Sequence, residues 1–338
     1  MPTKPRVFVF SLTCIHLFNG LCLGQFLDWI RIIIMIKQFL AKTIRQVLRL
    51  TPQTSIYSPP LPQDTQAIEC TYLGTAGFII QNQQRTLVLD PYLSRVGVTE
   101  LLQPLHTNTA LLKKYIPQAH DVLIGHAHYD HILDAPDLCK QTGARLIGSR
   151  AACMVGRAAG LPESQLVETE GRENIACGEW TVRGLPSIHG KAIMGRIPIP
   201  GDISSPPVWP PKLLDLKHGL VLNWLVDTGS LKIVHIDSAD FIAEELKGVQ
   251  ADVVCLCAIG RKYRPNYVKE VVELLKPKWI VPCHWDTMFT HFEQEPDYIP
   301  SVDLEGFVAE IRAAGVEPIV MPMRGKQWFK RVWLTHRD

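Results

Sequence analysis

Short runs of apolar residues alternate with polar turns over much of the chain. Runs at 68–73, 78–81 and 86–90 predict three strands. The compact apolar run DVLIG at 121–125 is typical of a buried strand. Further strands are expected around 175–188, and 221–237 places two β-type runs around an Asp-Thr-Gly-Ser turn, which indicates a hairpin.

Helical periodicity enters from residue 133 onward. Helices are predicted at 133–141, 149–159, 239–247, 266–275 and 303–314, with strands at 252–259, 278–283 and 317–322. Hairpins followed by alternating strands and helices predict an α/β protein in which helices cover sheets. The segment 191–219 breaks the pattern, because it is rich in Pro and Gly and has no periodicity. Such long loops tend to be lids or binding loops.

The first 50 residues have a different pattern. Residues 7–27 contain no Asp, Glu, Lys or Arg, and this run is long enough to span a bilayer as a helix. The apolar segment after it is interrupted by basic residues, as in an amphipathic helix on an anionic membrane surface. These residues are Arg31, Lys37, Lys42, Arg45 and Arg49. The excess of positive charge after the run predicts a membrane-associated protein with its C-terminal domain on the cytoplasmic side.

An alternative translation start at Met35 would remove the apolar run, and the protein would then be cytoplasmic. Residues 51–66, TPQTSIYSPPLPQDTQ, are polar and Pro-rich and predict a linker. The predicted organisation is therefore a membrane anchor with an amphipathic helix at 1–50, a linker at 51–66, and a globular domain at 67–338.

The composition favours a large globular protein and argues against some classes of function. Of the 338 residues, 46% are hydrophobic, which suits a large buried core. The 35 basic and 33 acidic residues give a net charge of +2, and this balance provides no global field to attract nucleic acid. The nine cysteines form no C-x-x-C pair, and in a chain of this length they are interpreted as reduced, buried thiols.

The strongest chemical signal is GHAHYDH at 125–131. His126, His128 and Asp130 are spaced two apart, so in an extended stretch they project to one side, while His131 is free to serve a second centre. Imidazole and carboxylate ligands suit zinc, and a site without thiolates keeps a reactive water. A merely solvated histidine-rich loop is the alternative, but four metal-competent side chains directly after an apolar strand favour a metal site.

This motif resembles the signature of the metallo-β-lactamase fold superfamily, and the resemblance extends over 67–338. It implies a four-layer αββα sandwich. Further landmarks of the family are matched by SIHG, IVHIDSAD and WIVPCHWDT, which supply His189, Asp237 and His284. The sequence departs from the family at Ile236, where glycine is usual, and this leaves Asp240 and Asp227 as fallback candidates for Asp237.

The resemblance implies a site for two zinc ions. One ion would take His126, His128 and His189; the other would take Asp130, His131 and His284, with Asp237 between the two. A metal-bridging hydroxide would then hydrolyse an ester-type bond, with Asp130 and Asp237 as the catalytic carboxylates. Di-iron oxidoreductases of the family have Glu in place of His128, which favours zinc hydrolysis, although manganese and iron stay open as alternatives.

Two branches of the superfamily look nearest. TYLGTAGFII, LVLDPYL and PKWIVPCHWD resemble the branch of the ascorbate-phosphate lactonases, and HYDHILD resembles the N-acyl-phosphatidylethanolamine phospholipase D branch. The resemblance implies a small-molecule or lipid-like ester substrate, a phosphodiester or a lactone, met at the membrane surface. A soluble sugar-phosphate lactonase and a non-catalytic metal-bound binding module are the alternatives.

The loop 191–219 follows His189 and is expected to select the substrate. Its apolar residues could wall an acyl chain and its basic residues could meet a phosphate, or the loop could simply pack as a cover. The apolar candidates are Ile197, Ile199, Val208 and Trp209, and the basic ones are Lys191 and Arg196. A second basic patch at Arg261, Lys262 and Arg264 either binds an anionic group or is solvated.

Overall fold

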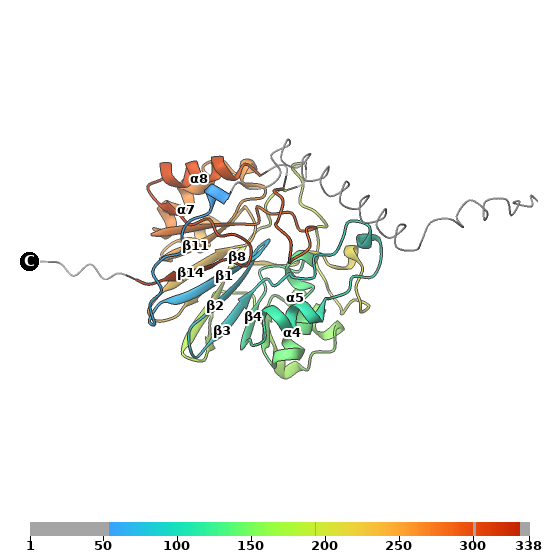
Figure 1. Ribbon diagram of the computed structural model, residues 1–338. Coiled ribbons are helices and arrows are strands. Elements are labelled where there is room, and N and C mark those ends of the chain that lie inside the picture. The colour runs from blue at the N-terminus through green and yellow to red at the C-terminus, as the bar shows by residue number, and fades with distance from the viewer. Residues whose placement is uncertain (1–53, 193, 300–301, 332–338) are drawn as a thin grey trace, which may run out of the picture. The chain divides into compact units, whose positions relative to one another are not determined.

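The computed structural model describes residues 54–192, 194–299 and 302–331. Two seven-stranded sheets lie face to face, and helices cover the outer face of each sheet, which gives four layers (Figure 1). The α/β fold class and the αββα sandwich predicted from the sequence are confirmed.

The first sheet has the strand order β14-β1-β2-β3-β4-β5-β6. Strands β14, β1, β2 and β3 pair antiparallel, and β3 to β6 pair in parallel. Helices α2, α4 and α5 cover this sheet. The elements are β1 (Ile68–Gly74), β2 (Gly77–Gln81), β3 (Thr86–Leu89), α2 (Thr109–Tyr115), β4 (Asp121–Leu123), α3 (Tyr129–Ile132), α4 (Ala135–Thr142), β5 (Arg145–Gly148), α5 (Arg150–Ala158), β6 (Leu166–Glu168) and β14 (Lys326–Phe329).

The second sheet has the order β13-β12-β11-β10-β9-β8-β7. Strands β7 to β10 pair antiparallel, whereas β10 to β13 run parallel, so the carboxyl ends of β10, β11 and β12 share one edge. Its elements are β7 (Asn174–Cys177), β8 (Trp180–Ser187), β9 (Val221–Asp227), β10 (Lys232–Ile236), α6 (Ala243–Leu246), β11 (Val253–Cys257), α7 (Tyr267–Leu275), β12 (Trp279–Cys283), α8 (Leu304–Ala313) and β13 (Glu317–Pro318).

Two apolar cores hold the layers together. The larger core joins the facing sides of the two sheets and extends beneath α7 and α8, with Tyr72, Trp180 and Trp224 among its fully buried side chains. The smaller core lies between the first sheet and helices α2, α4 and α5. Every described cysteine is buried and free, in keeping with the interpretation of the cysteines as reduced thiols.

Most predicted strands and helices form near their expected positions, and the differences have physical causes. The helix expected at 239–247 is reduced to α6 at 243–246, because the Arg264 guanidinium binds the Asp240 side chain and the Phe241 carbonyl and holds this stretch extended. Strand β14 had no clear signal, since four residues at a sheet edge depend on pairing with β1, more than 250 residues away in the sequence.

The described part of the predicted linker lies along the sandwich. The Ser58 amide donates to the Val320 carbonyl at 2.8 Å, and the Leu61 amide donates to Gln327 Oε1 at 2.8 Å. These bonds join the segment to residues near the C-terminal end of the domain. The domain boundary at residue 67 stays a prediction.

The predicted membrane location needs correction. Within 54–192, 194–299 and 302–331, no helix combines the length and the apolar character that crossing a bilayer requires. The prediction of a membrane-associated protein with a cytoplasmic catalytic domain is wrong on this finding. The proposed span at 7–27 and the basic amphipathic segment after it lie outside the described residues.

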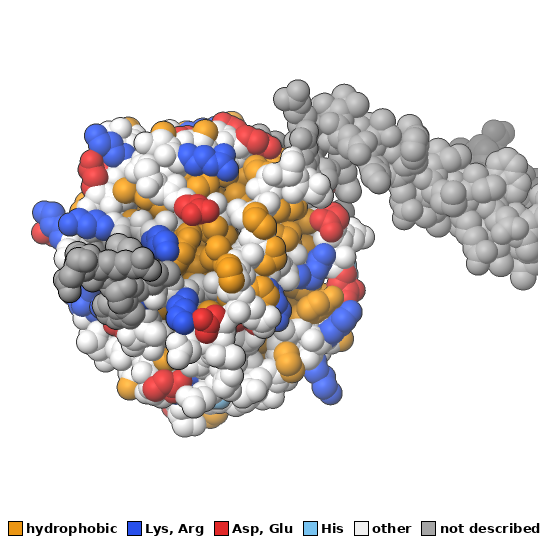
Figure 2. Space-filling view, turned by 60° about the vertical axis from the view of Figure 1, so that its left-hand side comes forward, with side chains coloured by type: hydrophobic (Ala, Val, Ile, Leu, Met, Phe, Trp, Pro, Cys, Tyr) orange, Lys and Arg blue, Asp and Glu red, His pale blue; other side chains and the backbone are white. Residues whose placement is uncertain are grey.

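Several large hydrophobic side chains remain on the surface. Figure 2 shows hydrophobic side chains gathered in the middle of one face, with Lys, Arg, Asp and Glu side chains around them. Exposed large hydrophobic residues include Leu102, Met194, Val208, Leu214 and Phe289. Apolar groups on a surface are ordinary when single, but a contiguous group marks a place where something binds.

Candidate metal centre

The histidine-rich segment lies between β4 and α3. It follows β4, His128 has an extended backbone, and α3 begins at Tyr129. A Cβ atom on Gly125 would overlap the Asp237 carboxylate, so glycine at this position lets that carboxylate approach the end of β4. Four buried donor residues follow the glycine: His126, His128, Asp130 and His131.

The other three predicted donors follow strands of the second sheet. His189 comes after β8, Asp237 directly after β10, and His284 directly after β12. Because β10 and β12 run in the same direction, their carboxyl ends bring Asp237 and His284 to one edge of the sheet. All seven predicted residues therefore meet at one end of the sandwich.

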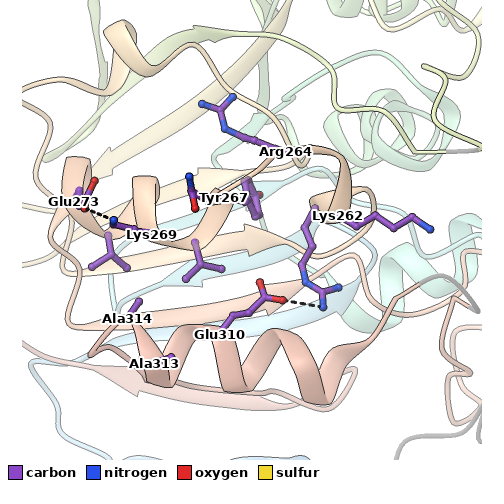
Figure 3. A pocket seen from close by; sticks show the side chains of 12 residues that line it. Lys262, Arg264, Tyr267, Lys269, Glu273, Glu310, Ala313 and Ala314 are labelled. Carbon is purple, nitrogen blue, oxygen red and sulfur yellow. Dashed lines mark hydrogen bonds and ion pairs between the residues drawn. The ribbon is translucent and has the colours of Figure 1, made fainter.

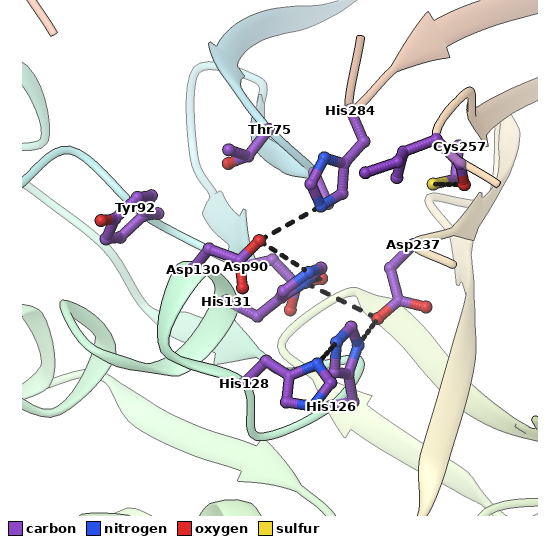
Figure 4. Close-up of polar contacts among 12 residues, drawn as sticks. Thr75, Asp90, Tyr92, His126, His128, Asp130, His131, Asp237, Cys257 and His284 are labelled. Atoms are coloured by element: carbon purple, nitrogen blue, oxygen red, sulfur yellow. Dashed lines mark hydrogen bonds and ion pairs between the residues drawn. The ribbon is translucent and has the colours of Figure 1, made fainter. Parts of the chain in front are cut away.

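These residues form three overlapping groups, and within each group the candidate ligand atoms lie within 4.8 Å of one another; Figure 4 labels all of them except His189. The first group, called the imidazole triad below, is His126, His128 and His189. The second, called the mixed triad, is Asp130, His131 and His284. The third is His126, His131 and Asp237, and it joins the two triads.

Distances within the centre show how closely the donors converge. His126 Nε2 lies 3.0 Å from His128 Nδ1, and His284 Nε2 lies 3.2 Å from Asp130 Oδ2. Asp237 Oδ2 is 2.5 Å from His126 Nδ1 and 3.7 Å from His131 Nδ1. The Asp237 carboxylate thus faces one histidine from each side of the centre.

The two fallback aspartates do not join this cluster. Asp240 is bound by Arg264, and Asp227 faces Lys232 at 3.3 Å. Asp237 reaches the centre even though Ile236 replaces the glycine usual in the family, because the Ile236 side chain is fully buried in the core between the sheets.

Burial keeps the imidazole triad uncharged. It lowers the pKa of His128 to about 4 and that of His189 to about 3, and it lowers the pKa of His126 well below its usual value. Neutral imidazole nitrogens carry free lone pairs near neutral pH, so this triad presents the form of histidine that binds metals.

The mixed triad carries charge instead. Burial alone would raise the pKa of Asp130, but the adjacent His131 and His284 side chains hold it below its usual range. Burial also opposes charge on His131, yet the Asp130 and Asp90 carboxylates raise its pKa to about 9. Two carboxylates and an imidazole therefore share compensating charges at this side of the centre.

Asp90 is a member of this centre that the sequence analysis did not identify. It follows β3 in the run LVLD, and its Oδ2 lies 2.9 Å from His131 Nδ1. Its Oδ1 accepts the Gly125 amide at 2.7 Å, and burial raises its pKa to about 6. A carboxylate directly after a buried strand was the available signal, since the same arrangement predicted Asp237.

A buried ion pair supports His284. Arg95 Nη1 lies 2.8 Å from Asp286 Oδ2, and both side chains are fully shielded from solvent. Asp286 Oδ1 accepts the Thr75 amide at 2.8 Å, and the Thr75 carbonyl accepts the His284 amide at 2.6 Å. These bonds hold His284 at φ 53°, a left-handed conformation that non-glycine residues rarely adopt without such support.

Two observations show that the donor set fits metal ions. Asp237 Oδ1 and His284 Nδ1 are buried, and neither has a hydrogen-bond partner among the described residues. The donors are imidazole nitrogens and carboxylate oxygens, and no thiolate stands among the grouped residues. Such nitrogen and oxygen sets bind divalent transition metals, and an ion would satisfy the orphaned carboxylate oxygen.

A cavity of about 780 Å³ opens over both triads, and its walls beyond the donors are mostly apolar. Of the predicted loop residues, Ile199 lines this cavity, and the unpredicted Met194 and Pro198 line it as well. Trp209 instead packs against the smaller core. Val208, Lys191 and Arg196 are not among the lining residues.

The predicted basic patch borders two cavities. All three residues line a second cavity of about 720 Å³ beside α7 and α8 (Figure 3), and Lys262 alone of the three also lines the cavity over the triads. Arg261 lies 3.4 Å from Glu310, and Arg264 binds Glu270 at 2.6 Å. These two arginines are therefore already paired.

Comparison with known proteins places this arrangement in context. Residues 69–284 match a family described as beta-lactamase superfamily domain. A UPF0173 metal-dependent hydrolase from Pyrobaculum arsenaticum is 26% identical over 235 residues, which cover 68% of this chain and 89% of that protein. The same-named protein of Myxococcus xanthus is 27% identical, with 68% of this chain and 74% of that protein covered.

A solved structure shares the fold. Igni18, a metallo hydrolase from the hyperthermophilic archaeon Ignicoccus hospitalis, superposes with a TM-score of 0.54 at 16% identity. The superposition covers 79% of this chain and the whole of that one. The likeness in fold thus extends over the whole length of that chain.

Proposed function

Because this chain belongs to the beta-lactamase superfamily and is a metal-dependent hydrolase, we propose that it is a zinc hydrolase that cleaves ester-type bonds at a site for two ions. The observation that carries this proposal is the convergence of seven donors from four strand ends into groups whose ligand atoms lie within 4.8 Å of one another. A binding module without catalysis would not need a carboxylate shared by two metal-competent triads.

In this proposal one ion would be held by the imidazole triad and the other by the mixed triad. Asp237, whose Oδ2 faces His126 and His131, would contribute to both. Zinc is favoured because it prefers imidazole and carboxylate ligands in sites that keep an open position, and because His128 stands where the di-iron enzymes of the family have Glu. Manganese and iron are the alternatives for the same donors.

When bound, the ions supply an acidified water and polarise the attacked oxygen. The chain's residues hold the reacting groups in place. Asp130 is buried and ionised between His131 and His284, so it can orient a nucleophilic water and accept its proton. Asp237 faces both triads and so holds them in place relative to each other. The cavity walls exclude bulk water from the reacting bond.

The proposed substrate is a phosphodiester or a lactone, the two ester classes that the sequence resemblance implies. The mostly apolar cavity supports a substrate with a substantial apolar part. Hydrolysis of a phosphodiester consumes one water and yields a phosphate monoester and an alcohol, whereas hydrolysis of a lactone consumes one water and opens the ring to a hydroxy acid. Neither reaction needs a further reactant.

The test uses the full-length, zinc-loaded chain with bis(4-nitrophenyl) phosphate and with a simple γ-lactone. Hydrolysis of at least one substrate is expected, and His128→Ala should lower kcat/KM about a thousandfold, since a metal ion contributes several kcal/mol to transition-state stabilisation. His106→Ala is the control, because His106 is exposed and lies outside the donor groups. Unchanged activity in His128→Ala would refute the proposal.

A further inference from the structure

The cavity over the two triads is polar at the metal-competent donors and mostly apolar elsewhere. Away from the metal-competent donors its walls are built largely from aliphatic, thioether and aromatic side chains, including Leu101, Met194, Ile199, Leu213, Met288 and Phe289. Met194 and Phe289 remain exposed to solvent, at 90% and 37% of their surface. The apolar wall therefore continues from the cavity toward its mouth.

Few polar side chains interrupt this wall. Apart from the donors and two tyrosines, the polar side chains that line the cavity are Ser238, Lys262 and Thr287. Ser238 Oγ already accepts the Gly190 amide at 2.8 Å. A sugar ring would leave most of its hydroxyl groups without partners here, and unpaired buried hydroxyls are costly. The lining thus disfavours the sugar-phosphate substrate that the sequence left open.

Lys262 is the one Lys or Arg among the described residues that line this cavity. It lies in a 3-10 turn, Arg261–Tyr263, after β11. The neighbouring cations Arg261, Arg264 and Lys269 each face carboxylates, whereas the described residues place no carboxylate within 4.0 Å of Lys262. Figure 3 shows Lys262 extending away from Glu310 and α8. The Lys262 Nζ atom lies over the Tyr263 ring, 5.2 Å from its centroid, and no carboxylate among the described residues neutralises its charge.

We propose that Lys262 binds an anionic group of the substrate, and that the substrate of this site is a monoanionic amphiphile. Its apolar chain would occupy the cavity, its ester or lactone bond would lie over the triads, and its acidic group, a carboxylate or a phosphate diester remote from the reacting bond, would meet Lys262. This inference rests on the proposed function. A single cation in an apolar wall matches one negative charge and leaves a dianion undercompensated.

Equilibrium binding tests this without depending on turnover. The probe is 1-decanesulfonate, an anion that coordinates metals weakly, compared with neutral 1-decanol by calorimetry on the zinc-loaded full chain. The sulfonate should bind about tenfold more tightly than the alcohol, as a partly desolvated charge contact provides. Within a series of alkanesulfonates, each added methylene should raise affinity about threefold until the cavity is filled.

Three variants test whether Lys262 is responsible for the preference for the sulfonate. Lys262→Met should abolish the preference for the sulfonate, and Lys262→Arg should keep it. Lys269→Met, an exposed lysine that lines the other cavity, should bind both probes like the parent protein. The proposal fails if the parent protein shows no preference for the sulfonate, or if Lys262→Met retains it.

A hydrolytic comparison separates this inference from the proposed function. The substrates are 4-nitrophenyl octanoate and the mono-4-nitrophenyl ester of octanedioic acid, which differ by a terminal carboxylate. The ratio of their kcat/KM values should favour the acidic ester and fall about tenfold in Lys262→Met. Absence of hydrolysis with these esters, with bis(4-nitrophenyl) phosphate and with the γ-lactone would contradict the proposed function, while the sulfonate measurement would still decide the role of Lys262.

Discussion

The two triads of the metal centre are held in place by different means. The imidazole triad is surrounded by loop backbone: His189 Nδ1 donates to the Gly190 carbonyl at 2.7 Å, and His128 Nε2 lies 3.4 Å from the Ile199 carbonyl. The mixed triad is supported by buried charge, since Asp90 holds His131 and the Arg95–Asp286 pair supports the turn that positions His284. The imidazole triad consists of uncharged side chains, whereas the mixed triad contains side chains of opposite charge that compensate one another.

This difference predicts where each half of the centre is vulnerable. If an imidazole of the first triad loses its contact with a loop carbonyl, the side chain is uncharged and can adopt another orientation at small cost in free energy. Loss of one buried charge leaves its partner uncompensated in a medium that solvates ions poorly, which is a far larger penalty. Substitutions beneath the mixed triad should therefore affect folding and metal binding together.

The largest effect is expected for Arg95→Met. It leaves the Asp286 carboxylate buried without its cation, and the free energy of unfolding should fall by about 3–5 kcal/mol in chemical denaturation. Arg157→Met is the matched control: its ion pairs with Glu163 and Glu168 lie at the surface, where both carboxylates are exposed, so their loss should lower the free energy of unfolding by about 0–1 kcal/mol. Equal decreases in the free energy of unfolding for the two variants would show that the buried ion pair stabilises the fold no more than a surface ion pair does.

The next effect depends on pH and concerns Asp134. This carboxylate accepts the amides of Leu93 and Ser94 beside Arg95, and burial raises its pKa to about 6. Because the folded-state pKa lies above the unfolded value, the protonated form is favoured by folding. The contribution of Asp134 to stability is therefore intact below about pH 4 and declines as pH rises through 6.

Unfolding of the parent protein and of Asp134→Asn should be compared between pH 4 and pH 7. The free energy of unfolding of the parent protein, relative to the variant, should fall by about 1–3 kcal/mol over this range. Using the difference removes the titration of groups that both proteins share. Parallel curves would contradict the assignment of the shift to Asp134.

The smallest effect is expected for Asp90→Asn. The amide keeps the size of the side chain but removes the charge beside His131 Nδ1, so zinc affinity should fall about tenfold to a hundredfold, as for other residues that orient metal-binding histidines. Competition with a chelator measures this change. If Asp90→Asn binds zinc like the parent protein, the buried-charge account of the mixed triad is wrong.

Much of the centre was accessible from the sequence because its donors follow apolar strands. GHAHYDH, SIHG, IVHIDSAD and WIVPCHWDT each place a donor where a strand ends, and the parallel order of β10 to β12 then brings such ends together. Their ligation of metal stays a prediction, and their convergence was expected because the family resemblance places these residues at one site. The succession of hairpins and alternating units predicted sheets covered by helices, and the family resemblance implied the four layers.

The features of the site that could not be predicted from the sequence depend on contacts between segments that are distant in the chain. Arg95 and Asp286 are 191 positions apart, and nothing local marks them as partners. Lys262 stood beside Arg261 and Arg264 as one of three similar cations, and only the carboxylates supplied by other elements distinguish it from them. Trp209 was one candidate for the cavity wall, and it packs instead against the smaller core, as the alternative of a covering loop allowed.

The central claim is that two triads hold two ions, and metal content tests it most directly. Full-length protein, His128→Ala and His131→Ala should be loaded with zinc, freed of excess ion, and measured by inductively coupled plasma mass spectrometry with circular dichroism to verify folding. We expect about two zinc ions per parent chain and about one in each variant, because each substitution removes a ligand from a different triad. A parent chain that binds no zinc, or variants that keep its full stoichiometry, would contradict the account.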